Sequence, residues 1–275
     1  MPRKRKKVFW FFFAKKHCLL ACCLAASPAL ADWRPLDPAN TLVIDTTTGH
    51  IVVEMHPELA PQSVARVKLL AREGVYDGLL FHRVIDHFVD QTGNPNNHDG
   101  GVSKHPDLPP EFTAHVPALD AVAARARDQT SGFIGSLPVL AVQKHGQPGA
   151  PLVWGAYCQG VAGMGRQAAP TTGNSEIFFM RDPSRVLDHD YAVWGRVVAG
   201  LDVVRRVAVG EPPVHPDRML AVHVMADLPP ARRPQLHVED TRAPAFQARL
   251  AAQVARAGAA FSLCDVDIAV RGVAP

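Results

Sequence analysis

The chain has 275 residues, and its 29 basic and 26 acidic residues give a formal net charge of +3 at pH 7. Seven of the basic residues and none of the acidic ones lie in positions 1–31, so the remaining 244 residues carry 22 minus 26 charges, a balance of −4. This acidic balance argues against a nucleic-acid-binding protein, which needs a basic surface to release counterions. The length fits either one barrel with extensions or two domains.

Residues 1–31 have the three parts of a secretory signal peptide. A basic segment begins at Arg3, a short apolar core runs from Cys18 to Ala26, and Ala29-Leu30-Ala31 is a small-x-small cleavage site. We therefore expect cleavage after Ala31 and a periplasmic or secreted protein. The apolar core is too short to span a bilayer. A lipoprotein processed at Cys22 is the less favoured alternative, because little apolar sequence precedes that residue.

Cleavage would leave two of the five cysteines, Cys158 and Cys264. An exported pair can form a disulfide. Two separate buried thiols are the alternative, because the sequence does not supply the geometry that a bridge requires. The sequence has no Cys-x-x-Cys motif and no zinc-type histidine spacing, so we expect neither a metal nor a cofactor.

The first elements of the mature chain are a hairpin and a helix. Two β-like runs, Thr41 to Asp45 and His50 to Met55, flank a Thr-Gly turn. Pro61 then stands where the first turn of a helix tolerates proline, and an apolar stripe with helical spacing continues until Gly74. The pattern predicts one amphipathic helix after the hairpin.

The next segment, Phe81 to Pro95, contains a charged residue in an apolar run. Leu79 to Ile85 and the short run that starts at His87 predict two strands joined by a tight connection, and Gly93 ends the second. Alternation would place the guanidinium of Arg83 on an apolar face. A surface ion pair would account for this arginine, and a functional role is the alternative.

The run Phe-His-Arg-Val-Ile, followed after two residues by Phe-x-x-Gln-x-Gly, occupies residues 81–93 and resembles the signature of the cyclophilin-type peptidyl-prolyl isomerases. Tyr76-Asp77-Gly78, Ala60-Pro61 and Glu111-Phe112 are similar to further steps of that family's pattern. The segment from Ser175 to Val197 resembles the family without a gap. This resemblance favours the functional interpretation of Arg83.

The resemblance implies a mainly β fold, a closed eight-stranded antiparallel barrel capped by two helices, within a domain of residues 32–228. A loop-rich insertion at about 113–158 would add strands or a flap. A C-terminal extension, residues 229–275, would pack on the domain as a decoration with a helix from Ala243 to Ala257 and a strand from Phe261 to Val270.

The activity implied by the resemblance is rotation of X-Pro peptide bonds without a covalent intermediate. Arg83 would stabilise the twisted amide, and Phe88 and Gln91 complete the implied catalytic set. The implied substrate-binding residues are Val89, Gly165, Arg166, Glu176, Phe178, Val186, Leu187 and Tyr191. The expected partners are proline-containing polypeptides that are unfolded or folding, and we expect a monomer.

Four rim positions depart from the family pattern. Arg166 stands where Asn is common, Glu176 replaces Gln, Val186 occupies a position often held by Trp, and Tyr191 replaces His. The catalytic residue types are retained. The altered rim motivates a second hypothesis, a non-catalytic module that holds proline-containing segments.

Overall fold

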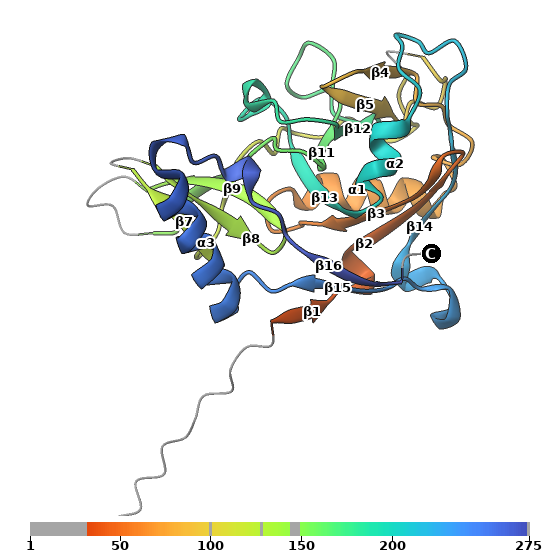
Figure 1. Cartoon of the computed structure of the whole chain (residues 1–275). Helices are drawn as coiled ribbons and strands as arrows, with labels where there is room; N and C mark the ends of the chain where they lie inside the picture. The colour runs from red at the N-terminus through yellow and green to blue at the C-terminus, as the bar shows by residue number, and fades with distance from the viewer. Residues whose placement is uncertain (1–31, 99–100, 127–128, 144–148, 274–275) are drawn as a thin grey trace, which may run out of the picture.

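The computed structural model describes residues 32–98, 101–126, 129–143 and 149–273. An antiparallel sheet of eight strands organises the part of the chain between Thr41 and Val224, with the spatial order β14-β2-β3-β13-β11-β12-β5-β4 (Figure 1). The strands are β2 Thr41–Thr46, β3 Gly49–Met55, β4 Arg83–Ile85, β5 Val89–Thr92, β11 Val161–Met164, β12 Ile177–Met180, β13 Val193–Ala199 and β14 Met219–Val224.

The sheet curls, and backbone in or next to β4 at one edge is hydrogen-bonded to backbone in or next to β14 at the other. The amide of Gly78 donates to the carbonyl of Met219 at 2.7 Å, and Val84 and Gly210 exchange two backbone hydrogen bonds of 2.8 and 2.9 Å. The pairs Val84–Gly210 and Leu80–Arg218 are isolated bridges and do not form a continuous ladder. They also explain why β4 is shorter than the predicted strand from Leu79, because the backbone before Arg83 bonds across this seam instead of within a hairpin.

Two helices cover the barrel, as the resemblance implied. Helix α1, Pro61–Arg72, packs against β14 and β13, and helix α2, Leu201–Arg206, packs against β3. The carboxylate of Glu111 accepts the amide hydrogens of Gln62 and Ser63 at 2.8 and 2.7 Å. It thus satisfies two N–H groups that have no partner within the helix at the start of α1, where negative charge is also favourable.

The predicted insertion forms a second antiparallel sheet of five strands, in the order β6-β10-β9-β8-β7. Helix α3, Pro244–Ala257, packs on β7, and its Phe246 belongs to one buried apolar cluster with Phe133 of β8. The insertion and the C-terminal extension therefore bury apolar surface against each other. The strands are β6 Ala114–His115, β7 Ala121–Arg125, β8 Thr130–Ile134, β9 Leu137–Val142 and β10 Leu152–Gly155.

Both ends of the described chain meet in a third sheet, β1-β15-β16, formed by Trp33–Pro35, Gln235–Glu239 and Val270–Val273. The prediction of a strand from Phe261 to Val270 is wrong. The Ser262 hydroxyl accepts the amide hydrogen of Cys264, and the backbone turns there instead of extending. Short 3-10 turns occur at Pro38–Asn40, Arg185–Leu187, Met225–Asp227, Pro230–Arg232, Gly258–Ala260 and Leu263–Asp265.

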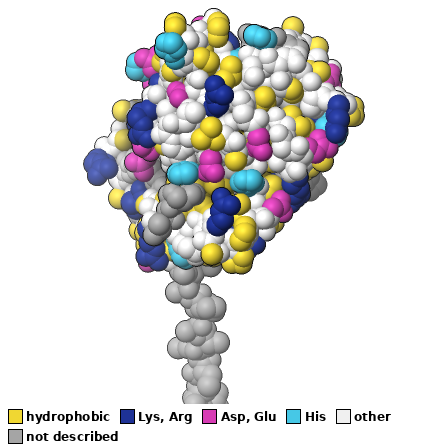
Figure 2. Space-filling view, turned by 90° about the vertical axis from the view of Figure 1, so that its right-hand side faces the viewer, with side chains coloured by type: hydrophobic (Ala, Val, Ile, Leu, Met, Phe, Trp, Pro, Cys, Tyr) yellow, Lys and Arg dark blue, Asp and Glu magenta, His cyan; other side chains and the backbone are white. Residues whose placement is uncertain are grey.

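The predicted signal peptide, including Cys22 and the cleavage site after Ala31, lies outside the described residues. Within the described residues, the structure contains no helix long and apolar enough to cross a membrane. Acidic, basic and histidine side chains are interspersed over the face shown in Figure 2.

Candidate active site

A pocket of about 300 Å³ opens on the barrel next to the β4–β5 hairpin. Three elements supply its walls: this hairpin, the adjoining ends of β11 and β12, and the loop before β13. The lining residues are Arg83, Phe88, Val89, Gln91, Gly165, Arg166, Gln167, Glu176, Phe178, Leu187 and Tyr191. The structure thus brings together the three residues predicted as catalytic and all but one of those predicted to bind substrate.

Val186 is the predicted residue that does not line the pocket. It lies in the 3-10 turn Arg185–Leu187, and 81% of its surface is exposed, whereas the next residue, Leu187, faces the cavity. Gln167 lines the pocket but was not predicted. Its position directly after Gly165 and Arg166 is the sequence feature that could have indicated its place in the pocket.

Arg83 is held by two acceptors from different parts of the chain. Its Nη1 donates to Oε1 of Gln91 at 2.9 Å, and its Nε donates to Oε2 of Glu211 at 2.8 Å. Arg83 and Gln91 are register partners on β4 and β5, so the motif spacing places them side by side. The side chain is 31% exposed, which leaves the guanidinium accessible from the pocket. No sequence signal pointed to Glu211, which lies 128 positions away.

The apolar side of the pocket is built around Phe178 on β12. Tyr157 stacks behind its ring with a centroid distance of 5.7 Å, and Tyr191 meets it edge-on at 5.7 Å. A Cβ atom on Gly163, the β11 partner of Phe178, would lie 2.2 Å from this ring. Only glycine at position 163 therefore allows the ring to occupy this place.

Three of the four departures from the family pattern, Arg166, Glu176 and Tyr191, line the pocket. The guanidinium of Arg166 lies 4.5 Å from the ring centroid of Tyr191, a cation–π contact, and its Nε donates to the carbonyl of Asp190 at 3.0 Å. Oε1 of Glu176 pairs with Nε2 of buried His82 at 2.9 Å. Two of the altered residues, Arg166 and Tyr191, therefore contact each other.

A buried ion pair lies behind the pocket. Asp90 on β5 is fully buried and accepts a hydrogen bond of 2.9 Å from Nη1 of Arg181. Burial raises the pKa of Asp90 to about 7, although the hydrogen bond and charge of Arg181 act in the opposite direction. Because Val89 and Gln91 flank Asp90 on the same strand, this pair helps to fix the strand that supplies them.

The arrangement offers an apolar seat of aromatic and aliphatic side chains next to an accessible, oriented guanidinium. It provides a place for an apolar ring and a donor beside it. In such a site a hydrogen-bond donor can favour one rotational state of a bound amide over another. That chemistry needs no nucleophile activated by a base.

Comparison with known proteins identifies the family. The sequence profile described as cyclophilin type peptidyl-prolyl cis-trans isomerase/CLD matches residues 41–224. The protein named "Probable peptidyl-prolyl cis-trans isomerase" from Brucella suis biovar 1 is 30% identical over 207 residues, which cover 70% of this chain and 85% of that protein. An isomerase from Schizosaccharomyces pombe is 28% identical over 60% of this chain and 83% of its own length.

A crystal structure of a cyclophilin from Hirschia baltica is similar beyond the bounds of the family profile. It has a TM-score of 0.77 and 30% sequence identity, and the match covers 88% of this chain and 95% of that one. The profile match, the relatives and this structure agree with one another and with the pocket. The chain belongs to the cyclophilin-type peptidyl-prolyl cis-trans isomerase family.

Proposed function

We propose that this protein accelerates cis-trans rotation of X-Pro bonds in polypeptides that fold after export. The observation that carries the proposal is the placement of Arg83, held by Gln91 and Glu211 at the edge of an aromatic pocket. A proline ring in the pocket would place its amide nitrogen within reach of the guanidinium.

The chemistry requires stabilisation of a twisted amide. Rotation breaks the amide resonance, which accounts for a barrier of about 18–20 kcal/mol, and leaves the nitrogen lone pair localised. A donor aimed at that lone pair interacts more strongly with the twisted state than with the planar one. Arg83 is the donor in this proposal, and no covalent intermediate or cofactor takes part.

The substrate would be fixed on both sides of the rotating bond. The proline ring would rest on Phe88, Phe178 and Leu187, which line the pocket. Gly165 and Arg166 also line the pocket, and the peptide unit between them would offer a carbonyl and an N–H to the substrate backbone. Because one side of the rotating bond is held while the other side turns, the binding energy can favour the twisted amide.

The assignment to exported substrates rests on the predicted signal peptide. The disulfide between Cys158 and Cys264 supports it, because such bonds persist in oxidising compartments. We expect mass spectrometry of the protein isolated from its native host to give Asp32 as the first residue. A lipid-modified Cys22 at the N-terminus would instead support the lipoprotein alternative, and retention of residues 1–31 would argue against both.

The isomerase activity can be tested with an Ala-Pro-containing peptide observed by exchange NMR. We expect the purified protein to increase the cis-trans exchange rate in proportion to its concentration, and Arg83→Ala to lose most of this increase. Activity of the wild type no greater than that of Arg83→Ala would overturn the proposal. Peptide binding at the pocket without faster exchange would instead support the non-catalytic module, which the altered rim residues motivate.

A further inference from the structure

We propose that Tyr157 is a positioning residue for the proline pocket, and that the insertion and the C-terminal extension act through it. The inference rests on the proposed function, since it concerns the same pocket. It assigns a role to the parts of the chain that lie outside the barrel: they hold the apolar side of the pocket in place.

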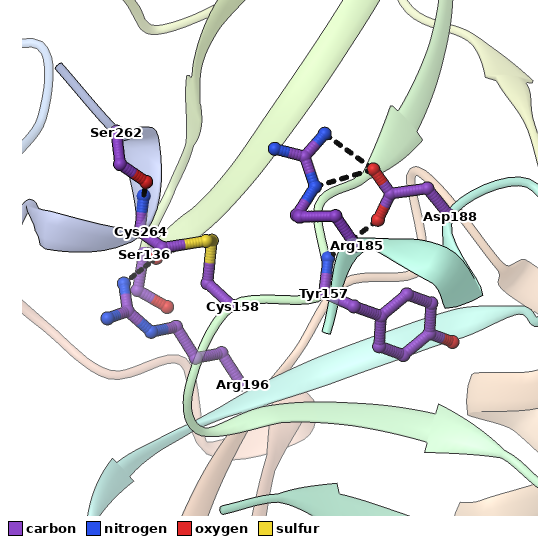
Figure 3. The surroundings of a disulfide bond; sticks show 8 residues. All are labelled: Ser136, Tyr157, Cys158, Arg185, Asp188, Arg196, Ser262 and Cys264. Atoms are coloured by element: carbon purple, nitrogen blue, oxygen red, sulfur yellow. Dashed lines mark hydrogen bonds and ion pairs between the residues drawn. A yellow bond between two sulfur atoms is a disulfide. The ribbon is translucent and has the colours of Figure 1, made fainter. Parts of the chain in front are cut away.

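Tyr157 is fully buried and contacts the pocket from behind. Its ring stacks on Phe178, with an interplanar angle of 22°. Its N–H donates to Oδ1 of Asp188 at 3.0 Å, and its carbonyl accepts the N–H of Ser184 at 2.9 Å (Figure 3 shows the first of these). Tyr157 therefore supports both Phe178, on the apolar side of the pocket, and the loop that carries Leu187.

A second residue of the insertion contacts the same loop. The ring centroid of Trp154, on β10, lies 3.9 Å from that of His189. Trp154 is buried, and His189 adopts a left-handed backbone conformation with φ of +66°. That conformation is uncommon for residues other than glycine, although histidine adopts it more often than most. The contact with Trp154 lies against the part of the loop that precedes Tyr191.

The disulfide fixes this segment to the C-terminal extension. Cys158 directly follows Tyr157 and is bonded to Cys264 in the turn Leu263–Asp265 (Figure 3). Leu263 and Phe246 of the extension belong to the same buried cluster as Tyr157 and Phe178. The extension, the disulfide and the apolar side of the pocket around Phe178 are thus parts of one continuous apolar core.

The catalytic side of the pocket is held by other side chains. Arg83 is oriented by Gln91 on β5 and by Glu211 in the loop before β14, and both lie outside the segment around Tyr157. Loosening that segment should weaken the seat for substrate and leave the guanidinium in place. Loss of binding that is equal in the ground and transition states raises KM without lowering kcat.

Two variants test this role. Asp188→Ala removes the acceptor of the Tyr157 N–H, and a double variant, Cys158→Ser with Cys264→Ser, releases the extension. We expect Asp188→Ala to raise KM for the Ala-Pro peptide about fivefold, the ratio that corresponds to one ordinary hydrogen bond. The double variant should raise KM in the same direction, and kcat should stay within about twofold in both. Arg185→Ala is the matched control, because it removes the ion pair to Asp188 and retains the carboxylate that Tyr157 needs.

The outcomes separate a positioning role from a purely structural one. A fall in kcat with unchanged KM would mean only that less protein is folded, and it would overturn the inference, as would unchanged kinetics in both variants. If the double variant does not fold, Asp188→Ala decides alone. If the wild type does not catalyse exchange, the proposed function fails, but the dissociation constant of the same peptide from NMR titration still tests the inference: it should rise about fivefold in Asp188→Ala and stay constant in Arg185→Ala.

Discussion

Replacing Arg83 by alanine is expected to lower kcat/KM for an Ala-Pro peptide by about two to three orders of magnitude, the effect of losing one preorganised donor to the transition state. The loss should appear in kcat, because the apolar seat around Phe178 is unchanged and continues to bind the planar substrate. Single-site exchange NMR over a range of peptide concentrations separates the two constants.

Arg83→Lys sharpens the test. The two acceptors, Gln91 and Glu211, bind different nitrogens of one planar guanidinium, Nη1 and Nε. A lysine carries a single compact ammonium group and cannot satisfy both acceptors in this geometry while it also faces the substrate. We expect roughly tenfold or greater loss of kcat despite the retained charge. Wild-type kcat in the lysine variant would show that charge alone is sufficient. It would contradict the role of the planar guanidinium that Gln91 and Glu211 orient.

The part of the site that could be predicted from the sequence is the part fixed by local spacing. Arg83 and Gln91 are eight positions apart on a hairpin, so their pairing follows from the register once the turn at Asp86-His87 is recognised. The walls supplied by Phe178 and Leu187 followed from the family resemblance. Glu211 and Tyr157 could not be found in this way, because their contacts depend on how distant loops cross the barrel seam and on where the insertion packs.

The fold outside the barrel shows the same limit. The helix Pro244–Ala257 was predicted from its apolar spacing, which is a local property. The strand predicted from Phe261 was wrong, because a disulfide partner and a serine cap at Ser262 determine the backbone there. The backbone near Cys264 therefore does not pair as a strand. The chain joins a sheet only at Val270, where β16 pairs with β15.

A second large effect is expected at the junction of the three sheets. Glu54 on β3 is 7% exposed, and its two carboxylate oxygens accept hydrogen bonds of 2.5 and 2.9 Å from Arg34 on β1. The β8–β9 turn packs on this pair, since a Cβ on Gly135 would lie 3.2 Å from Nη2 of Arg34. The C-terminal extension reaches the same turn through a hydrogen bond of 3.1 Å from Thr241 to the Gly135 carbonyl.

The electrostatics of Glu54 make this junction sensitive to acid. Burial alone would raise the pKa of Glu54, but the hydrogen bonds from Arg34 and the charges of His56 and Arg34 outweigh it and lower the pKa from 4.5 to about 2. The folded state therefore binds this proton more weakly than the unfolded state. The stabilisation is complete above pH 4.5 and is lost as the pH falls towards 2, an expected decrease of about 3 kcal/mol in the free energy of unfolding.

Chemical denaturation at several pH values measures this decrease, and Glu54→Gln should remove it. Asp90 contributes little below pH 3.8, because its raised pKa affects stability between pH 3.8 and about 7 and with the opposite sign. If the free energy of unfolding of Glu54→Gln falls below pH 4.5 as steeply as that of the wild type, Glu54 is not the source of the acid sensitivity.

Arg34→Ala should destabilise the protein more strongly, by about 3–5 kcal/mol at pH 7, because it leaves a buried carboxylate without its main partner. Arg72→Ala is the matched control: its pair with Asp227 is about half exposed on both sides, and the expected cost is less than about 1 kcal/mol. If Arg34→Ala cost no more than Arg72→Ala, the pair at the junction would not be what joins β1 and the β8–β9 turn to the barrel. A large difference between the two variants would instead show that the added sheets are fastened to the catalytic domain through a buried ion pair, in addition to the apolar core and disulfide behind the pocket.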